Sequence, residues 1–360
     1  MEIKASSKSY EVHLEENLQF IQYLSERENA LYVLDKNVYE IYKNEFYNIP
    51  KDKLILIEAT EENKVIETAL EICERLTDIP AKRNAVLISF GGGIIQDLTG
   101  FVANITYRGI HWVFVPTTLL AACDSCIGGK TSLNYKKYKN LLGTFYPPDD
   151  IYIAPEFFKT LTERDFKSGL GEVIKFNIMA GMNALTNTEN CIPKLLARDD
   201  AVLNQFVESS LKFKKTFIEL DEFDKGERIK LNFAHTFGHA IEVVTSYEIP
   251  HGTAVAIGMI MADYISLDRG LVSEDIIKRM EKLLLSVIDI DVKLLQVPLE
   301  NYIAAVRKDK KQTSEDLTAV LIVEYLEEAR LKVVHDIQVK EIEDAIGYFI
   351  EIYEEYYNEN

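Results

Sequence analysis

Short runs of apolar, often β-branched residues alternate with helix-length segments over residues 1–155, and this alternation constrains the fold more than any other feature. An amphipathic stretch around Val65–Arg75 is one of the helical segments. Strands that are separated by helices form βαβ units, whose strands pair mainly in parallel. Four runs are predicted to be the buried strands of such a sheet: Ala30–Leu34, Leu54–Ile57, Asn84–Phe90 and Trp112–Val115.

The pattern changes near Pro155, beyond which long helical segments dominate and the next strand-like run is Thr318–Val323. A chain of 360 residues is long enough for two domains. We therefore predict an α/β protein, with a parallel-sheet domain over residues 1–155 and a mostly α-helical domain over residues 156–360.

The charge of the chain limits its partners. With 58 acidic and 40 basic residues the formal net charge is −18, so the surface repels nucleic acid and we expect no nucleic-acid partner. A small phosphorylated ligand would need basic side chains gathered at one site. The chain has no apolar run approaching the roughly 18 residues of a membrane span, and its N-terminus does not resemble a signal peptide. We expect a cytoplasmic protein that does not enter a membrane.

Two glycine-rich segments suggest phosphate contacts. Gly91-Gly92-Gly93 follows the third predicted strand directly, where the backbone of a turn can approach a pyrophosphate at the start of a helix. It is not a GxGxxG sequence, so an ordinary glycine turn stays open at this point. Gly128-Gly129-Lys130-Thr131 suggests a P-loop, but the first glycine of that motif would fall at position 124, which is Asp. The nucleotide-triphosphatase reading therefore fails.

Cys123 and Cys126 form a lone CxxC in a chain with four cysteines. A zinc ribbon needs a second such pair, and four scattered cysteines do not make a disulfide framework. We interpret these thiols as structural or incidental.

The segment from Asn232 to His239 carries a histidine pair. On a helix His235 and His239 are i and i+4, so both imidazoles project from one face, and His251 follows closely. Metal sites often use imidazoles on one rigid element. A zincin peptidase would have Glu beside the first histidine, but position 236 is Thr. Taken alone, such a pair is more often two ordinary helix residues than part of a metal site.

Further charged residues lie in segments that contain or adjoin Gly or Pro. They are found in Tyr107-Arg108-Gly109, in Lys139-Asn140, on one helical face at Glu172 and Lys175, at Lys214 and Arg228, and in Arg307–Lys311. Any one of them, taken alone, reads as a solvated surface residue. In this order and combination, however, the segments from Gly91 to Lys311 resemble 3-dehydroquinate synthase and its relatives, the sugar phosphate cyclases.

The resemblance implies a Rossmann-like domain that binds NAD, followed by a mostly helical domain that binds a metal. Matched position by position, the ligands of Zn²⁺, or alternatively Co²⁺, would be Glu172, His235 and His251. His239 would not be a ligand; it matches a histidine that faces the substrate and helps in proton transfer.

The same matching implies a cofactor site and a substrate site. The NAD site would include Asp35, Glu61, Lys64, Gly92, Gly93, Asp97, Thr117, Thr118 and Lys139. Catalysis would involve His239, Lys175, Asn232, Asp124, Lys130, Lys214 and Arg228. Further substrate contacts would come from Arg108, Asn140 and one of Lys310 or Lys311. Such a group of cations suits a ligand with both a carboxylate and a phosphate.

The implied activity converts 3-deoxy-D-arabino-heptulosonate 7-phosphate to 3-dehydroquinate and phosphate in the shikimate pathway of aromatic amino acid biosynthesis. NAD is recycled within each turnover, and a homodimer is expected. Gln96, Cys126, Tyr138 and Thr253 depart from the common pattern and bear on substrate identity. The alternatives are a related cyclase acting on sedoheptulose 7-phosphate or glucose 6-phosphate, and a metal-dependent polyol dehydrogenase. An uncharged polyol would not call for the cations, and a non-catalytic relative would lack a ligand or His239.

Overall fold

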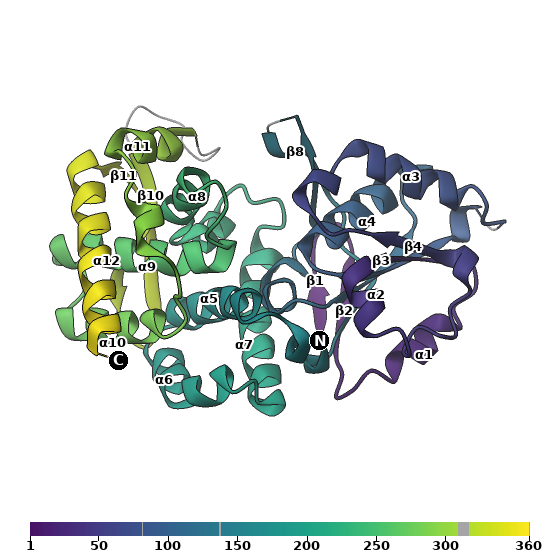
Figure 1. The fold of residues 1–360 in the computed structure, drawn as a ribbon, viewed down its shortest axis with the longest axis horizontal. Coiled ribbons are helices and arrows are strands. Elements are labelled where there is room, and N and C mark those ends of the chain that lie inside the picture. Colours follow the sequence, from purple (N-terminus) through teal and green to yellow (C-terminus); the bar gives the residue numbers. More distant parts are fainter. Residues whose placement is uncertain (81, 137, 309–316, 360) are drawn as a thin grey trace. The chain divides into compact units, whose positions relative to one another are not determined.

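The computed structural model describes residues 1–80, 82–136, 138–308 and 317–359. Its contacts divide the chain into two compact units (Figure 1). The first unit comprises Met1–Leu161 together with Leu203–Phe223, and the second comprises Thr162–Val202 together with Asp224–Asn360. Each unit is described by itself below.

The first unit is built on a seven-stranded sheet in the order β1-β2-β9-β6-β5-β3-β4. Every neighbouring pair is parallel except β1 and β2, which are antiparallel. Strand β5, which lies between β6 and β3, is buried along its whole length, as a strand covered on both faces should be. The strands are β1 Glu2–Lys4, β2 Ser9–Leu14, β3 Ala30–Asp35, β4 Leu54–Ile57, β5 Val86–Gly91, β6 His111–Pro116 and β9 Asp150–Ile153.

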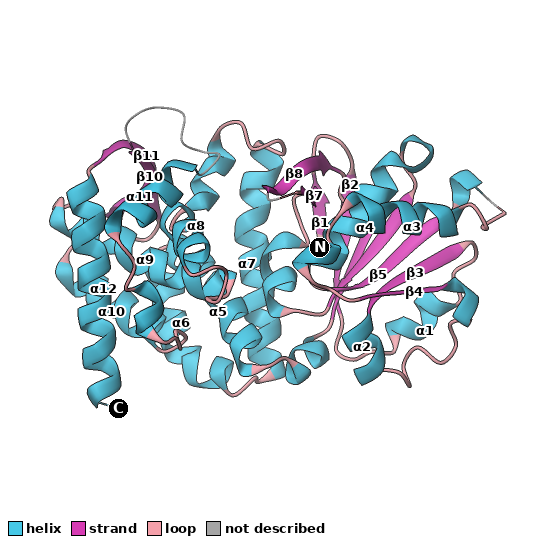
Figure 2. Ribbon diagram, turned by 45° about the horizontal axis from the view of Figure 1, so that its top comes forward, coloured by secondary structure: helices cyan, strands magenta, loops and turns pink. Residues whose placement is uncertain are grey.

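Helices cover this sheet on both faces: α3 and α4 lie on one face, and α1 and α2 lie on the other (Figure 2). Their bounds are α1 Phe20–Ser25, α2 Lys36–Ile41, α3 Ile66–Leu76 and α4 Gly93–Ile105. A separate antiparallel hairpin, β7 Lys130–Tyr135 with β8 Tyr138–Phe145, packs against α4. Most of α7, Asp200–Leu220, also belongs to this unit.

The second unit is mostly helical, and α9 lies at its centre. Nearly every side chain of α9 is buried, because the helix packs against α5, α8, α10, α12 and β10. A helix that is apolar on all sides has to be surrounded in this way. The helices are α5 Glu163–Met179, α6 Met182–Leu196, α8 His235–Val244, α9 His251–Asp268, α10 Glu274–Leu285, α11 Leu299–Lys308 and α12 Val339–Glu359; the strands are β10 Leu317–Tyr325 and β11 Ala329–Ile337.

The fold class predicted from the sequence is confirmed. The four predicted strands correspond to β3, β4, β5 and β6, and the later strand-like run corresponds to β10. The amphipathic stretch is α3. Among the described residues, no helix is both long enough and apolar enough to span a membrane.

Candidate metal and cofactor sites

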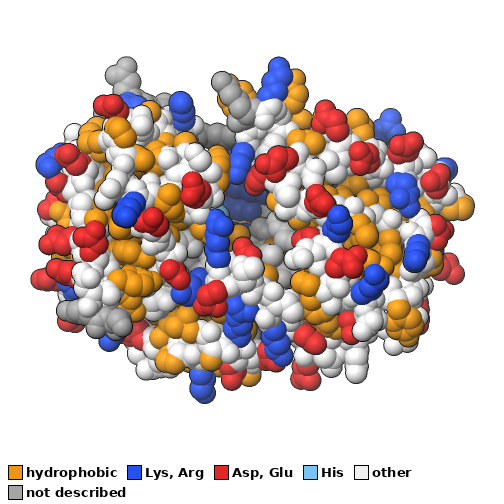
Figure 3. Space-filling view, viewed as in Figure 1, with side chains coloured by type: hydrophobic (Ala, Val, Ile, Leu, Met, Phe, Trp, Pro, Cys, Tyr) orange, Lys and Arg blue, Asp and Glu red, His pale blue; other side chains and the backbone are white. Residues whose placement is uncertain are grey.

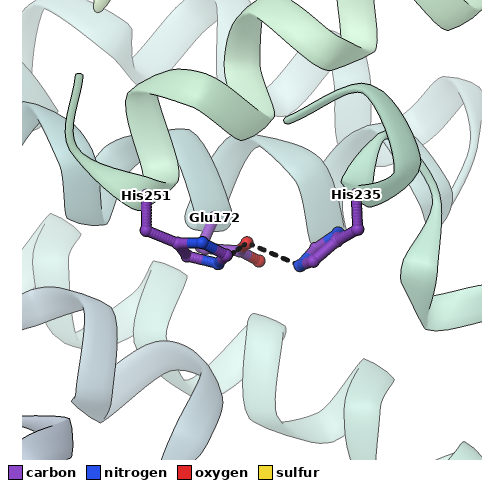
Figure 4. Close-up of side chains that lie close together, drawn as sticks. All are labelled: Glu172, His235 and His251. Atoms are coloured by element: carbon purple, nitrogen blue, oxygen red, sulfur yellow. Dashed lines mark ion pairs between the residues drawn. The ribbon is translucent and has the colours of Figure 1, made fainter. Parts of the chain in front are cut away.

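Three helices of the second unit bring Glu172, His235 and His251 together. Glu172 lies in α5, His235 is the first residue of α8, and His251 is the first residue of α9. Figure 4 shows both imidazoles directed at the Glu172 carboxylate. One ligand atom from each residue falls within 4.8 Å of the others. These are the three residues that the resemblance implies as metal ligands.

The spacing of these atoms suits a tetrahedral zinc ion. The Nε2 atoms of His235 and His251 lie 3.4 and 3.6 Å from Oε1 of Glu172. Two atoms that each lie about 2.0–2.1 Å from a tetrahedral zinc are about 3.3 Å apart. Glu172 is completely buried. The donor set therefore fits a divalent metal with three protein ligands and an open coordination position, which is the arrangement of a catalytic site.

Each histidine is oriented through its other ring nitrogen. The Nδ1 atom of His235 lies 3.0 Å from the carbonyl oxygen of Phe233, and the Nδ1 atom of His251 lies 3.0 Å from Oε2 of Glu242. Burial lowers the pKa of His251, but the charges of Glu242 and Glu172 and the hydrogen bonds to them outweigh it and raise the pKa to about 10. With no metal bound, both ring nitrogens are therefore protonated, and the cationic ring lies between two carboxylates.

A glycine pair allows α5 and α9 to approach closely enough to form the cluster. A Cβ atom on Gly252 would lie 1.8 Å from the carbonyl oxygen of Ser168, and one on Gly171 would lie 2.2 Å from the carbonyl oxygen of Gly252. The Gly252 N–H also donates a hydrogen bond to Oγ of Ser168, at 3.0 Å. Because Gly171 precedes Glu172 and Gly252 follows His251, the close helix crossing sets the separation of two ligands.

Lys175 and His239 lie beside the cluster. Lys175 Nζ is 2.5 Å from Oε2 of Glu172 and donates a hydrogen bond to the carbonyl oxygen of Leu231, at 3.3 Å. Its side chain is almost fully buried. The His239 ring lies 5.3 Å from the His235 ring and 5.8 Å from the His251 ring, centroid to centroid. His239 is therefore a near neighbour of the ligands but lies outside the Glu172 set.

The short helix η7, Glu227–Asn232, leads into α8 and carries two more predicted residues. Arg228 is buried and Asn232 is partly exposed. After them, Ala234 adopts the left-handed conformation, with φ +70°. A non-glycine residue in this region is strained by roughly 1–2 kcal/mol. The strained turn lets α8 begin at His235, which places His235 and His239 on the same helix face.

In the first unit, predicted cofactor residues follow four adjacent parallel strands. Asp35 ends β3, Glu61 and Lys64 follow β4, Gly92 and Gly93 follow β5, and Thr117 and Thr118 follow β6. The carboxyl ends of parallel strands meet at one edge of the sheet, where α/β proteins bind ligands. A Cβ atom on Gly92 would lie 3.1 Å from Thr118, so the turn before α4 is narrow. The first turn of α4 supplies backbone N–H groups suited to a pyrophosphate.

A polar network beside this edge joins three of the predicted residues. Lys64 forms an ion pair with Asp97 and donates a hydrogen bond to Oδ1 of Asn140, at 2.6 Å. Burial raises the pKa of Asp97, while Lys64 and Ser132 act to lower it. Ser132 Oγ contacts Asp97 and Asn140, at 3.2 and 2.9 Å. The sequence interpretation missed Ser132.

Asn134 is the second residue of this network that the sequence interpretation missed. Its amide group donates a hydrogen bond to Glu61 Oε2, and its Oδ1 accepts one from the backbone N–H of Asn140. Lys139 Nζ lies 3.5 Å from Oε1 of Glu61. Residues 132 and 134 share one face of β7, and this period of two was a usable signal.

Lys214 and Asp124, two further predicted site residues of the first unit, form an ion pair. Lys214 Nζ donates hydrogen bonds to Oδ1 and to the backbone carbonyl of Asp124, both at 2.7 Å. Arg108 is exposed in a turn where Tyr107, Arg108 and Gly109 all have positive φ. Lys130 is exposed at the start of β7. Lys310 and Lys311 lie outside the described residues.

Gln96 and Cys126, which depart from the family pattern, are both buried. Gln96 is buried and exchanges two hydrogen bonds with Ser125, one to its carbonyl and one from its hydroxyl. These bonds tie α4 to the turn that carries Asp124. Burial raises the pKa of the Cys126 thiol to about 12, so the thiol stays protonated and unreactive. Cys123 is also buried, and its thiol donates a hydrogen bond to the carbonyl oxygen of Leu120, at 3.6 Å.

The charged groups on the face shown in Figure 3 are dispersed, with acidic and basic side chains interspersed. The buried groups differ from this surface: Lys64, Lys175, Lys214 and Arg228 are each at most 6% exposed. Burying a cation is costly unless it is paired. The buried cations therefore set these regions apart from the solvated surface.

A parallel-sheet unit with a glycine-turn cofactor edge, joined to a helical unit with a Glu-His-His cluster, defines a class of metal-dependent, dinucleotide-using enzymes. Residues 54–168 match the family model described as 3-dehydroquinate synthase N-terminal, and residues 169–312 match the model described as 3-dehydroquinate synthase C-terminal. The chain belongs to the 3-dehydroquinate synthase family.

Similar curated proteins carry the same name. The chain is 35% identical over 344 residues to the 3-dehydroquinate synthase of Dictyoglomus turgidum, which covers 94% of this chain and 95% of that protein. It is 36% identical over 355 residues to the 3-dehydroquinate synthase of Clostridium tetani. That alignment covers 94% of this chain and 93% of the Clostridium tetani protein.

Solved structures share the fold along nearly the whole chain. A 2-deoxy-scyllo-inosose synthase, complexed with carbaglucose-6-phosphate, NAD⁺ and Co²⁺, has a TM-score of 0.84 at 23% identity and covers 96% of this chain and 98% of its own. A 2-epi-5-epi-valiolone synthase from Streptomyces hygroscopicus, with NAD⁺ and Zn²⁺ bound, has a TM-score of 0.82 at 25% identity, with 96% and 97% covered. A glycerol dehydrogenase from Schizosaccharomyces pombe has a TM-score of 0.67 at 14% identity, with 97% and 91% covered.

Proposed function

We propose that this protein is a 3-dehydroquinate synthase. It converts 3-deoxy-D-arabino-heptulosonate 7-phosphate to 3-dehydroquinate and phosphate, and it depends on NAD and on a divalent metal, Zn²⁺ or Co²⁺. The reaction is a phosphate-eliminating cyclisation without net oxidation or reduction. The observation that carries the proposal is the Glu172, His235 and His251 cluster, in a chain whose similarity to the family runs almost from end to end.

In the proposed metal site, Glu172, His235 and His251 hold the ion. When bound, the metal supplies a Lewis acid that polarises hydroxyl and carbonyl oxygens of the substrate. Lys175 fixes the Glu172 carboxylate from the side, at 2.5 Å, and so limits its rotation. His239, on the same helix face as His235, exchanges protons with the substrate through its imidazole.

In the proposed cofactor site, the dinucleotide lies along the carboxyl edge of β3, β4, β5 and β6. When bound, NAD would supply reversible hydride transfer at a secondary alcohol of the substrate. The glycines before α4 leave room for the pyrophosphate. Asp97 is held by Lys64 and Ser132, and Asp35 and Glu61 offer carboxylates to sugar hydroxyls.

The proposed substrate contacts are mainly cationic. In the first unit they are Arg108, Lys130, Lys214 and Asn140, with Asp124 orienting Lys214; in the second they are Lys175, Arg228 and Asn232, and one of Lys310 or Lys311 is added from the sequence. Arginine and lysine bind phosphate and carboxylate groups through charge-assisted hydrogen bonds. A substrate with two anionic ends is the best match to this excess of cations, and it favours the keto-acid sugar over related sugar phosphates.

A phosphate-release assay on three sugars tests the assignment. A cation that loses its carboxylate partner costs roughly 1–3 kcal/mol. We therefore expect kcat/KM for 3-deoxy-D-arabino-heptulosonate 7-phosphate to exceed that for sedoheptulose 7-phosphate or glucose 6-phosphate by at least about tenfold. Equal or faster release from a sugar without the carboxylate would assign the chain to another cyclase reaction.

The proposal includes the cellular location and the oligomeric state of the enzyme. The expected form is a cytoplasmic homodimer, since the reaction belongs to soluble biosynthesis of aromatic amino acids. Size-exclusion chromatography with light scattering would give about 82 kDa for a dimer, twice the 41.2 kDa of the chain. A mass of one chain at assay concentrations would contradict the dimer.

A further inference from the structure

We propose that Glu242 is a positioning residue of the metal centre, which holds His251 with its Nε2 atom turned toward Glu172. The inference rests on the metal site proposed above. It adds a residue that has no contact with the metal but sets the geometry and the basicity of a ligand. The argument begins with the two ring nitrogens of His251.

The imidazole of His251 lies between two carboxylates. Its Nδ1 atom is 3.0 Å from Oε2 of Glu242, and its Nε2 atom is 3.6 Å from Oε1 of Glu172. When Nδ1 carries the ring proton, it donates a hydrogen bond to Glu242, and the lone pair of Nε2 points at the metal position. A carboxylate behind a metal-bound histidine fixes the ring and raises its strength as a ligand.

His235 has the same arrangement with a different acceptor. Its Nδ1 atom faces the carbonyl oxygen of Phe233, at 3.0 Å, and its Nε2 atom faces Glu172, at 3.4 Å. Both ligands thus present Nε2 to the metal position and turn Nδ1 to an acceptor. The acceptor behind His235 is backbone, whereas the acceptor behind His251 is a side chain. Only the acceptor behind His251, the Glu242 carboxylate, can be removed by substituting a side chain.

The position of His251 explains why it needs this support. It is the first residue of α9, it follows Pro250, and its side chain is 31% exposed, whereas that of His235 is 11% exposed. A side chain at a helix start with this exposure has fewer packing contacts to select one rotamer. Glu242 lies in α8, three residues beyond His239, so its hydrogen bond also links the start of α9 to the helix that carries the other ligand.

A different arrangement uses some of the same atoms. Ligand atoms of His239, Glu242 and His251 also lie within 4.8 Å of one another, which offers a second ligand set in which Glu242 would contact the ion. Two observations favour the positioning role. The 3.0 Å separation of Glu242 and His251 is an ordinary hydrogen-bond length. Glu172, in contrast to Glu242, is fully buried and faces both His235 and His251.

Zinc affinity of the metal-stripped protein tests the proposal without reference to activity. The variants are Glu242→Ala, Glu242→Gln, Glu172→Gln and His251→Ala, with competition against a chromogenic chelator as the measurement. Glu248→Gln is the matched control, because it removes one exposed carboxylate from the segment between α8 and α9. We expect Glu242→Ala to weaken zinc binding about 10- to 100-fold. Glu242→Gln, which keeps an acceptor oxygen, loses less than about fivefold, and Glu248→Gln matches the parent.

The ring tautomer provides a second readout that general damage to the fold would not change in this way. Long-range proton–nitrogen NMR of the zinc-loaded parent should place the His251 proton on Nδ1, and Glu242→Ala should weaken or lose that state while circular dichroism stays unchanged.

Three outcomes are distinguishable. Parent-like zinc affinity in Glu242→Ala refutes the positioning role. Loss in Glu242→Gln equal to that in His251→Ala, with full binding in Glu172→Gln, makes Glu242 a ligand and also refutes it. Failure of the parent itself to bind zinc refutes the proposed metal centre on which the inference depends.

Discussion

Replacing Gly252 by Ala should damage the metal centre through the packing of two helices, without changing any ligand. The added Cβ atom would lie 1.8 Å from the carbonyl oxygen of Ser168, whereas ordinary contact begins at 3.4 Å. The atom that it meets is backbone, so no side-chain rotation relieves the clash. The start of α9 has to move away from α5 by roughly 1.5 Å.

The consequence can be estimated from that movement. Overpacking against a rigid backbone costs about 1–3 kcal/mol of the free energy of unfolding. Because His251 precedes Gly252, the same shift carries its Nε2 atom away from Glu172, which lies in α5. A misplacement of about 1 Å at a catalytic centre can cost a factor of about 100. We expect zinc affinity to fall by at least about tenfold.

Urea unfolding and chelator competition measure the two effects. Gly347→Ala is the matched control, because Gly347 lies within α12 of the same unit and nothing lies within 4 Å of an added Cβ atom. That substitution should leave zinc affinity unchanged and stabilise the helix by up to about 1 kcal/mol. Parent-like stability and zinc affinity in Gly252→Ala would refute the claim that the glycine crossing sets the ligand spacing.

Two further predictions test other parts of the account. His251→Ala should weaken zinc binding by at least roughly 100-fold, since four-ligand structural zinc sites bind with about 10–16 kcal/mol, or about 2.5–4 kcal/mol per ligand, whereas His239→Ala should change it by less than about fivefold. Similar losses of zinc in elemental analysis of both variants would contradict the ligand assignment. Asp263→Asn should lessen the pH dependence of stability, because burial, and then the nearby Glu281, raise the pKa of Asp263 well above 3.8. The proton on folded Asp263 stabilises the protein fully below pH 3.8, and this contribution is lost by about 1.4 kcal/mol per pH unit as the pH rises toward the folded pKa. Urea unfolding at pH 5.5 and 8 should therefore show that the free energy of unfolding of the variant, relative to that of the parent, is higher at pH 8 than at pH 5.5. The same difference in free energy at both pH values would contradict the shifted pKa.

Local sequence patterns were sufficient for four of the seven strands of the sheet, whereas β1, β2 and β9 were not predicted. Each strand predicted in the first unit is a mainly apolar run that contains one or two β-branched residues, and β3, β4, β5 and β6 match those runs to within two residues. The hairpin of β7 and β8 was not predicted, since Lys130–Phe145 is polar and half-exposed. Nor could the local pattern show that residues 203–223 of the helical region return to the first unit, because that association is between residues far apart in the chain.

The metal cluster could be predicted only in part. Helical periodicity correctly places His235 and His239 on one face, but it cannot tell a ligand from its neighbour. Glu172 stands more than sixty positions before His235, and nothing in its local sequence joins the two. The family resemblance supplied that connection, and the close approach of α5 and α9 accounts for it physically. Glu242 was missed because a carboxylate behind a ligand has no motif of its own.

The central claim is a cyclisation in which NAD is used and restored in every turnover. The most direct test follows phosphate and the absorbance at 340 nm together, in zinc-loaded protein with NAD and 3-deoxy-D-arabino-heptulosonate 7-phosphate. We expect phosphate to be released over many turnovers, with 3-dehydroquinate as the product, while the steady-state absorbance stays flat. Accumulation of NADH in step with substrate consumption, without phosphate, would contradict the claim and indicate a polyol dehydrogenase.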